Sequence, residues 1–163
     1  MLVTAYRLVR RTRAKDAFTG EGSRLFGGRW TPKGLPAVYC SQHLSLCVLE
    51  LRVNQDRFLA QEGYRFFAIT FHSTVLESLS STDAPKGWDK PKTSSSRLTA
   101  AQRFGQLWLL EKRSAVLRVP SAVLSQESNF ILNPLHPDFA SIRISRASPI
   151  RLDSRLWRVA DVS

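Results

Sequence analysis

The sequence predicts a single α+β domain with a mixed β-sheet and helices packed against it. Of the 163 residues, 43% are hydrophobic and 23% are charged, a composition that supports one globular core. Segments with strand and helix patterns do not alternate strictly, which argues against a doubly wound parallel sheet. The most apolar segment, 64–71 (YRFFAITF), predicts a central strand. We therefore expect residues 1–163 to form one domain.

The first half of the chain predicts two strands and a helix around a glycine-rich loop. Apolar and polar residues alternate loosely over 3–9, which is typical of a first strand. The five glycines of 18–34, together with Pro32, predict a shaped loop without a helix. Residues 37–41 (AVYCS) predict a short strand, and 43–54 predict a helix of about three turns with apolar residues on almost every side.

The second half predicts a long surface connection, a second helix and three short strands. Seven serines and threonines with two prolines make 80–96 a connection rather than a regular element, and such loops often bind ligands. Residues 97–113 predict a helix with Ser94, Ser95 or Ser96 as N-cap and with Lys112 and Arg113 in its last turn. The predicted strands are 115–119, 130–132 and 142–144.

Charge and cysteine content narrow the possible functions. The net charge is +11, and 18 of the 24 cationic residues are arginine, whose planar fork of donors binds phosphate and carboxylate groups. An acidic or phosphorylated partner is therefore expected. Cys40 and Cys47 lack the spacing of a zinc site and are interpreted as core residues, so no metal is expected. No apolar run approaches the roughly 20 residues of a membrane span, and the N-terminus lacks the charge order of a signal peptide, which predicts a cytoplasmic protein.

Four residues are candidates for chemistry, each with a structural alternative. Glu50 is a carboxylate on an apolar side of the 43–54 helix, where it needs a ligand or a structural ion pair, for example with Arg7. Arg29 follows two glycines and is either an anion clamp or an exposed turn arginine. Tyr39 is either a stacking and hydrogen-bonding residue or a core tyrosine. Ser121 follows a predicted strand and is either a site residue or a turn serine.

Several motifs together resemble one known family. They run in family order from residue 6 to residue 139: 6–8 (YRL), 27–34 (GGRWTPKG), 38–41 (VYCS), 49–51 (LEL), 119–121 (VPS) and 129–134 (NFILNP). The chain resembles the RES domain family, the toxin half of RES/Xre-type toxin–antitoxin pairs. The family takes its name from an arginine, a glutamate and a serine, which match Arg29, Glu50 and Ser121 here, with Ser128 as the alternative serine. Thr31 stands where asparagine is common in the family.

The resemblance implies a fold similar to ADP-ribosyltransferases and an activity that cleaves the nicotinamide–ribose bond of NAD. NAD would be a substrate that is consumed, and no cofactor is implied. Glu50 would stabilise the cationic ribose and hold its hydroxyls, Arg29 would orient NAD, and Ser121 would position Glu50 or the amide. Tyr39, Trp30 and Arg7 would complete substrate binding. The acceptor, water or phosphate, stays open.

The resemblance also implies a separate antitoxin protein with a DNA-binding helix-turn-helix region. Two alternatives remain at this point. An ADP-ribosyltransferase would move ADP-ribose onto a protein target with the same fold. A nucleic-acid-binding module would explain the net charge and the cluster Arg10, Arg11 and Arg13, but the sequence has no recognition-helix signature and its basic residues are dispersed, so direct nucleic-acid binding is not expected.

Overall fold

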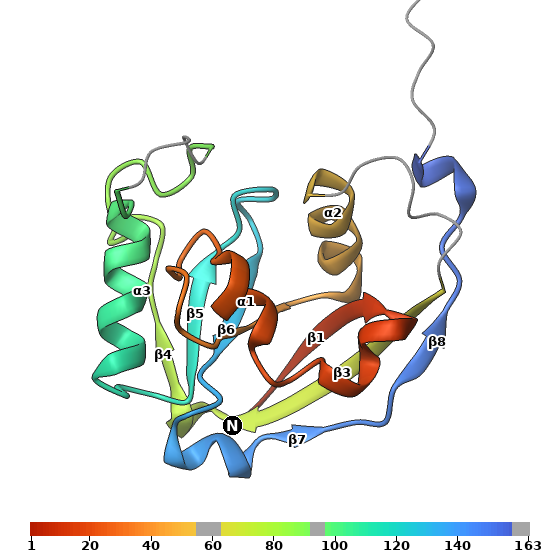
Figure 1. Cartoon of the computed structure of the whole chain (residues 1–163), viewed down its shortest axis with the longest axis horizontal. Helices are drawn as coiled ribbons and strands as arrows, with labels where there is room; N and C mark the ends of the chain where they lie inside the picture. Colours follow the sequence, from red (N-terminus) through yellow and green to blue (C-terminus); the bar gives the residue numbers. More distant parts are fainter. Residues whose placement is uncertain (55–62, 92–96, 158–163) are drawn as a thin grey trace, which may run out of the picture.

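One curled, mixed sheet organises the chain (Figure 1). The computed structural model describes residues 1–54, 63–91 and 97–157. The strands follow the order β4-β5-β6-β2-β1-β3-β7, with β8 also paired to β3. They are β1 (Leu2–Arg10), β2 (Val38–Ser41), β3 (Tyr64–His72), β4 (Leu76–Ser78), β5 (Val116–Pro120), β6 (Ser128–Leu132), β7 (Arg143–Ile144) and β8 (Ser148–Ile150). The helices are α1 (Glu21–Phe26), α2 (Leu44–Asn54), α3 (Ala100–Leu110) and the 3-10 helices η1 (Arg11–Asp16), η3 (Ser73–Val75), η4 (Pro137–Ser141) and η5 (Ser154–Trp157).

The mixed sheet confirms the predicted α+β class. β4 pairs parallel to β5, whereas the other described pairs are antiparallel. The expectation that β3 is central is wrong in part. It has neighbours on both sides, but only the short strands β7 and β8 separate it from one end of the sheet. Its apolar composition reflects burial on the faces of the sheet, where Ile69 and Phe71 belong to one core cluster and Phe67 packs against Phe18.

The prediction of a helix-free loop over 18–34 is wrong, because α1 lies within it. Gly20 and Gly27 flank α1 with φ angles of 75° and 69°, in a region that favours glycine. The glycines therefore begin and end the helix instead of preventing it. Thr31 lies in the irregular segment after α1 and Lys33 in a turn, and β2 begins at Val38.

The helix predicted over 97–113 is confirmed but is shorter at both ends. Its N-cap is Thr99, whose hydroxyl accepts from the backbone N–H of Gln102 while the Gln102 side chain accepts from the backbone of Thr99, a capping box. The predicted caps Ser94, Ser95 and Ser96 lie outside the described residues. Lys112 and Arg113 follow the helix instead of ending it, and Lys112 has a φ of 49°. Of the predicted connection 80–96, residues 80–91 form turns.

Alternate residues of the middle strands fill two apolar clusters on the two faces of the sheet. Val38, Val116 and Leu132 belong to the first cluster, and their strand neighbours Leu117 and Ile131 belong to the second. The second cluster receives α3 through Ala101, Trp108 and Leu109. Cys40 and Cys47 are buried free thiols, as predicted. Burial raises the pKa of Cys40 to about 12 and also raises that of Cys47.

Candidate active site

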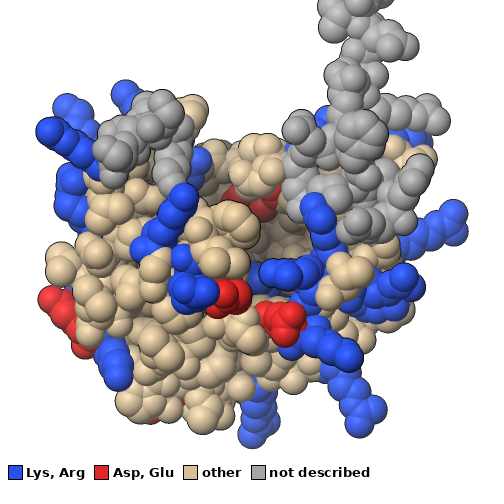
Figure 2. All heavy atoms as spheres, in the orientation of Figure 1, with Lys and Arg blue, Asp and Glu red and all other residues tan. Residues whose placement is uncertain are grey.

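A large cleft opens between β1, α1, β2, α2 and the turns around residues 87–91. Its volume is about 1750 Å³, and its lining includes Glu50 and four arginines, Arg7, Arg10, Arg13 and Arg29. Figure 2 shows lysine and arginine side chains gathered around a hollow on this face. The basic residues that suggested nucleic-acid binding, Arg10 and Arg13, therefore border the same cleft as the candidate carboxylate. Such a cleft favours an anionic ligand.

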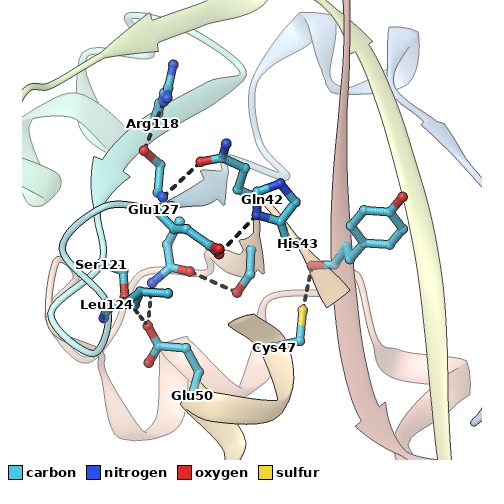
Figure 3. A network of polar contacts seen from close by, with 12 residues as sticks. Gln42, His43, Cys47, Glu50, Arg118, Ser121, Leu124 and Glu127 are labelled. Carbon is cyan, nitrogen blue, oxygen red and sulfur yellow. Dashed lines mark hydrogen bonds and ion pairs between the residues drawn. The ribbon is translucent and has the colours of Figure 1, made fainter. Parts of the chain in front are cut away.

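Glu50 projects from α2 toward the loop that follows β5 (Figure 3). Its Oε1 atom accepts two hydrogen bonds, from Ser121 Oγ at 3.0 Å and from Asn129 Nδ2 at 2.6 Å. Neither donor is charged. In the part of the chain that the structure describes, no ion pair joins Glu50 to a basic residue, so the structural ion pair considered from the sequence is not formed there.

Ser121 is held in one orientation by its own loop. Its side chain is fully buried, and its Oγ accepts from the backbone N–H groups of Val123 and Leu124, each at 3.1 Å. With both lone pairs occupied in this way, the hydroxyl proton is directed to Glu50. Ser128, the alternative family serine, lies elsewhere and accepts at its Oγ from Arg118 Nε at 3.0 Å. The structure therefore brings Ser121, and not Ser128, to Glu50.

The loop that carries Ser121 is fastened to the start of α2 (Figure 3). Gln42 makes two bonds to Ser128: its backbone N–H donates to Ser128 O at 2.9 Å, and its Oε1 accepts from Ser128 N at 3.0 Å. His43 Nδ1 lies 3.0 Å from Glu127 Oε2, and the Glu127 carbonyl accepts from Ser121 N at 3.1 Å. Helix, loop and β6 are thus tied together around Glu50.

Asn129 is a site residue that sequence reasoning missed. It lies on β6, directly opposite Ser41 on β2, and Ser41 Oγ donates to its Oδ1 at 2.8 Å. The only sequence signal was an amide at the start of an otherwise apolar strand within the 129–134 motif. Strand pairing, which the sequence does not specify, places it beside Glu50.

Arg29 borders the cleft and also holds one of its walls. Its Nη1 donates to the carbonyls of Trp88 and Lys90, each at 2.8 Å. The turn before it is fixed from α3, where the buried Gln102 donates through Nε2 to Gly28 O at 3.0 Å. Arg29 is therefore half-buried and anchored, unlike an exposed turn arginine, and its Nε and Nη2 groups remain for an anionic ligand. Gln102 and Trp88 were not singled out from the sequence.

Tyr39 supports the Arg29 turn through its hydroxyl. The hydroxyl accepts from Trp30 N at 3.1 Å and lies 2.9 Å from Thr31 Oγ1. Burial raises the pKa of Tyr39 to about 12, so the phenol stays neutral at physiological pH. A Cβ atom on Gly28 would lie 2.5 Å from the Tyr39 oxygen, which explains the glycine there. Thr31, the departure from the family pattern, keeps a side-chain oxygen within reach of Tyr39.

Trp30 and Arg7 differ in what they offer a ligand. Trp30 borders the cleft but is only 2% exposed, because its ring stacks on Trp88 and contacts Phe104. Trp30 therefore packs inside the wall of the cleft and offers little surface to a ligand. Arg7 donates through Nη1 to Tyr39 O at 2.6 Å, while its buried Nε has no hydrogen-bond partner among the described residues. Burial lowers the pKa of the Arg7 guanidinium.

Comparison with known proteins places the chain in a family. The RES domain model matches residues 4–153. The chain belongs to the RES domain family. This RES domain is 34% identical to "Toxin Res" of Photorhabdus laumondii, over 93% of the chain and 95% of that protein. It is 29% identical to the "Prs ADP-ribosylating toxin" of a Sphingobium species, over 92% of each.

Two further likenesses concern a mycobacterial protein. Over 71 residues, 42% of this RES domain and 38% of the relative, the chain is 45% identical to "NAD(+) phosphorylase MbcT" of Mycobacterium tuberculosis. The crystal structure of the M. tuberculosis MbcT-MbcA toxin-antitoxin complex matches with a TM-score of 0.70 and 20% identity, over 96% of this chain and 87% of that one. The latter likeness shows a shared fold.

Among residues 1–54, 63–91 and 97–157, no helix is long and apolar enough to cross a membrane. The same residues contain no group of three or more histidine, cysteine, aspartate or glutamate side chains arranged to hold a metal ion.

Proposed function

We propose that this RES domain is the toxin of a toxin–antitoxin pair and that it cleaves the bond between nicotinamide and ribose in NAD. The observation that carries the proposal is the Glu50 carboxylate, held by neutral donors in a cleft lined with four arginines. A volume of about 1750 Å³ accommodates a dinucleotide, since small-molecule pockets are typically about 300–1,000 Å³. The name of the Photorhabdus relative supports a toxin, and the name of the Mycobacterium relative, a NAD(+) phosphorylase, supports action on NAD.

The chemistry requires stabilisation of a cation. When the ribose C1′–nitrogen bond breaks, its electron pair leaves with nicotinamide, which departs as a neutral molecule without needing a proton. The ribose becomes an oxocarbenium-like cation, and the fixed negative charge of Glu50 stabilises it more than it stabilises the ground state. An acceptor then adds to C1′ and loses its proton to solvent. Arg29 and Arg7 bind the pyrophosphate, and Tyr39 contacts the nicotinamide end.

Phosphate is the acceptor that the 71-residue likeness to a NAD phosphorylase favours, with ADP-ribose 1″-phosphate as product. With water as acceptor the product is ADP-ribose. A second candidate is transfer of ADP-ribose to a protein, which is favoured by the relative that matches over 92% of the chain. All three reactions use the same bond cleavage at the same carboxylate.

Three incubations separate these reactions. Purified chain is incubated with NAD in phosphate-free buffer, in the same buffer with inorganic phosphate, and in phosphate-free buffer with an extract of cytoplasmic proteins. Nicotinamide and ADP-ribose products are measured in each incubation. Release of nicotinamide in phosphate-free buffer identifies hydrolysis, whereas release that requires inorganic phosphate, with a phosphorylated ADP-ribose product, identifies phosphorolysis. Modified protein with NAD loss only in the third condition supports transfer. An NAD pool that is unchanged in all three contradicts the proposed function.

The antitoxin and the cellular location complete the proposal. A toxin that removes NAD must act where NAD is plentiful, in the cytoplasm, and its own cell must contain an inhibitor. The match to a toxin within a toxin–antitoxin complex supports such a partner. We propose that the partner also carries the DNA-binding helix-turn-helix region of RES/Xre pairs.

A further inference from the structure

The Glu50 carboxylate presents its two oxygens to different surroundings. Oε1 accepts from Ser121 and Asn129, whereas no protein donor among the described residues contacts Oε2. The last torsion of a glutamate side chain is soft, so one hydrogen bond leaves the carboxylate plane free to rotate. Two donors from different elements, the loop after β5 and strand β6, remove that freedom. Glu50 borders the cleft, and the oxygen left for a ligand there is Oε2.

Asn129 can perform this role only if its amide nitrogen faces Glu50. An amide offers an acceptor on one side and donors on the other, and the wrong orientation would set Oδ1 against the carboxylate. The Glu50 carboxylate only accepts and therefore selects the amide nitrogen, and Ser41, which is only 5% exposed, stabilises the same orientation by donating to Oδ1 at 2.8 Å. The pairing of Ser41 with Asn129 in the β2–β6 ladder holds the two side chains together.

From this geometry we propose that Asn129, oriented by Ser41, is a positioning residue that fixes the Glu50 carboxylate with Oε2 toward the substrate. The proposal rests on the proposed function for its kinetic consequence. It explains why uncharged groups hold Glu50 in a cleft with four arginines: an arginine partner would neutralise the negative charge that the ribose cation requires, whereas an amide directs the carboxylate without removing its charge.

Besides the four arginines of the cleft, the described residues place several titratable groups around Glu50. Cys47, one turn earlier on α2, lies near both Glu50 and Arg7 of β1. Behind the Ser121 loop lie the His43–Glu127 pair and Arg118. The Asn129 amide does not ionise between about pH 2 and 12. A substitution that introduces an ionisable group at this position should therefore change how kcat depends on pH.

The test uses three variants and one control. Asn129→Ala should lower kcat by about 10- to 100-fold, as expected for the loss of a group that acts mainly in the transition state, with KM for NAD within about 3-fold. Ser41→Ala should have a smaller effect on kcat, of about 3- to 10-fold, because Asn129 loses the partner of its Oδ1 but keeps its bond to Glu50. Ser125→Ala, on the exposed part of the neighbouring loop with its hydroxyl on Gln126, should leave both constants unchanged.

Asn129→Asp separates positioning from a merely structural role. Aspartate has nearly the same shape, but two carboxyl groups about 2.6 Å apart cannot both ionise readily and titrate as a pair. The kcat profile of Asn129→Asp should therefore contain an additional ionisation that is absent from the wild type and from Asn129→Ala. If residue 129 acted only on the fold and not on Glu50, Asn129→Asp would lower the melting temperature while the kcat profile kept the wild-type ionisations.

A measurement without turnover makes the test independent of the proposed function. Carbon NMR of chain labelled at the glutamate carboxyl groups, with Glu50 assigned from Glu50→Gln, follows the Glu50 signal against pH. In Asn129→Asp this signal should titrate in two coupled steps. Wild-type chain that releases no nicotinamide contradicts the proposed function, yet the NMR result still tests whether residue 129 acts directly on the Glu50 carboxylate. The inference is overturned if folded Asn129→Asp shows the wild-type Glu50 titration, or if folded Asn129→Ala keeps kcat within about 3-fold.

Discussion

The Ser121 hydroxyl donates a hydrogen bond to Glu50 across 3.0 Å, although 71 positions separate the two residues in the chain. The bond has a fixed direction because two backbone N–H groups occupy the other side of the hydroxyl oxygen. It joins the loop after β5 to α2 and brings together two of the three residue types for which the RES family is named.

Glu50→Gln should reduce nicotinamide release from NAD by at least about 100-fold, because a fixed charge that acts in the transition state is removed while side-chain shape is kept. The measurement is the initial rate of nicotinamide formation at saturating NAD. The melting temperature should stay close to that of the wild type. A folded Glu50→Gln chain with full activity would remove Glu50 from the mechanism.

Ser121→Ala and Ser128→Ala should differ sharply. Ser121→Ala leaves Glu50 with one donor and also removes the acceptor for Val123 N and Leu124 N, so both activity and loop stability should fall. Ser128→Ala removes only a hydroxyl that accepts from Arg118. Parallel rate measurements and melting curves decide between them. A larger loss of activity in Ser128→Ala would show that the family serine is Ser128.

Arg29→Lys should weaken NAD binding by about tenfold, since a lysine keeps the charge but loses the planar fork, and it cannot bridge the carbonyls of Trp88 and Lys90 in the same way. Binding is measured by calorimetry in the Glu50→Gln background, so that NAD is not consumed. Arg103→Lys on the exposed side of α3 is the matched control. Equal NAD affinity in Arg29→Lys and wild type would assign Arg29 a purely structural role.

The sequence was sufficient for the elements with strong local patterns. β1 and α3 follow from apolar periodicity, and β2, β3 and α2 follow from short apolar runs bounded by polar or turn residues. α1 was missed because glycine was interpreted as excluding a helix, whereas Gly20 and Gly27 stand at its ends. The strands β4 and β8 have three residues each, too few for a periodic signal.

The sequence predicts only those candidate site residues that belong to its motifs. Arg29, Glu50 and Ser121 were identified from residue type and family resemblance, and the hydrogen bond between Glu50 and Ser121 supports the choice of serine. Asn129 depends on the register between β2 and β6, and Gln102 depends on how α3 packs against the Gly28 turn. Both are long-range relationships that no local pattern encodes.

Tyr39 should remain protonated to unusually high pH. Its pKa is raised from about 10 to about 12, chiefly by burial, so the folded chain holds the phenolic proton more tightly than the unfolded chain does. The associated stability is complete below about pH 10 and is lost as the pH rises toward 12. An absorbance titration of the phenolate band, compared between wild type and Tyr39→Phe, isolates its contribution from those of Tyr6 and Tyr64. Titration of Tyr39 near pH 10 in folded chain contradicts the burial argument.

The cognate antitoxin should compete with NAD. An enzyme that consumes NAD harms its own cell unless its cleft is covered. Arg7, Arg10, Arg13 and Arg29 give that cleft a positive lining. The segment of the antitoxin that covers the cleft should therefore be acidic or end in a carboxylate. We expect a C-terminal segment that approaches Arg29.

The association of the antitoxin with the chain should be fast and should slow as salt is added, because screening weakens steering by exposed charges. Arg13→Gln at the cleft should lower the association rate more than Arg143→Gln on β7, which does not border the cleft. Competition is measured in Glu50→Gln, which leaves NAD intact: saturating antitoxin should abolish NAD binding, and simultaneous binding with unchanged affinities would mean that the antitoxin acts at another surface.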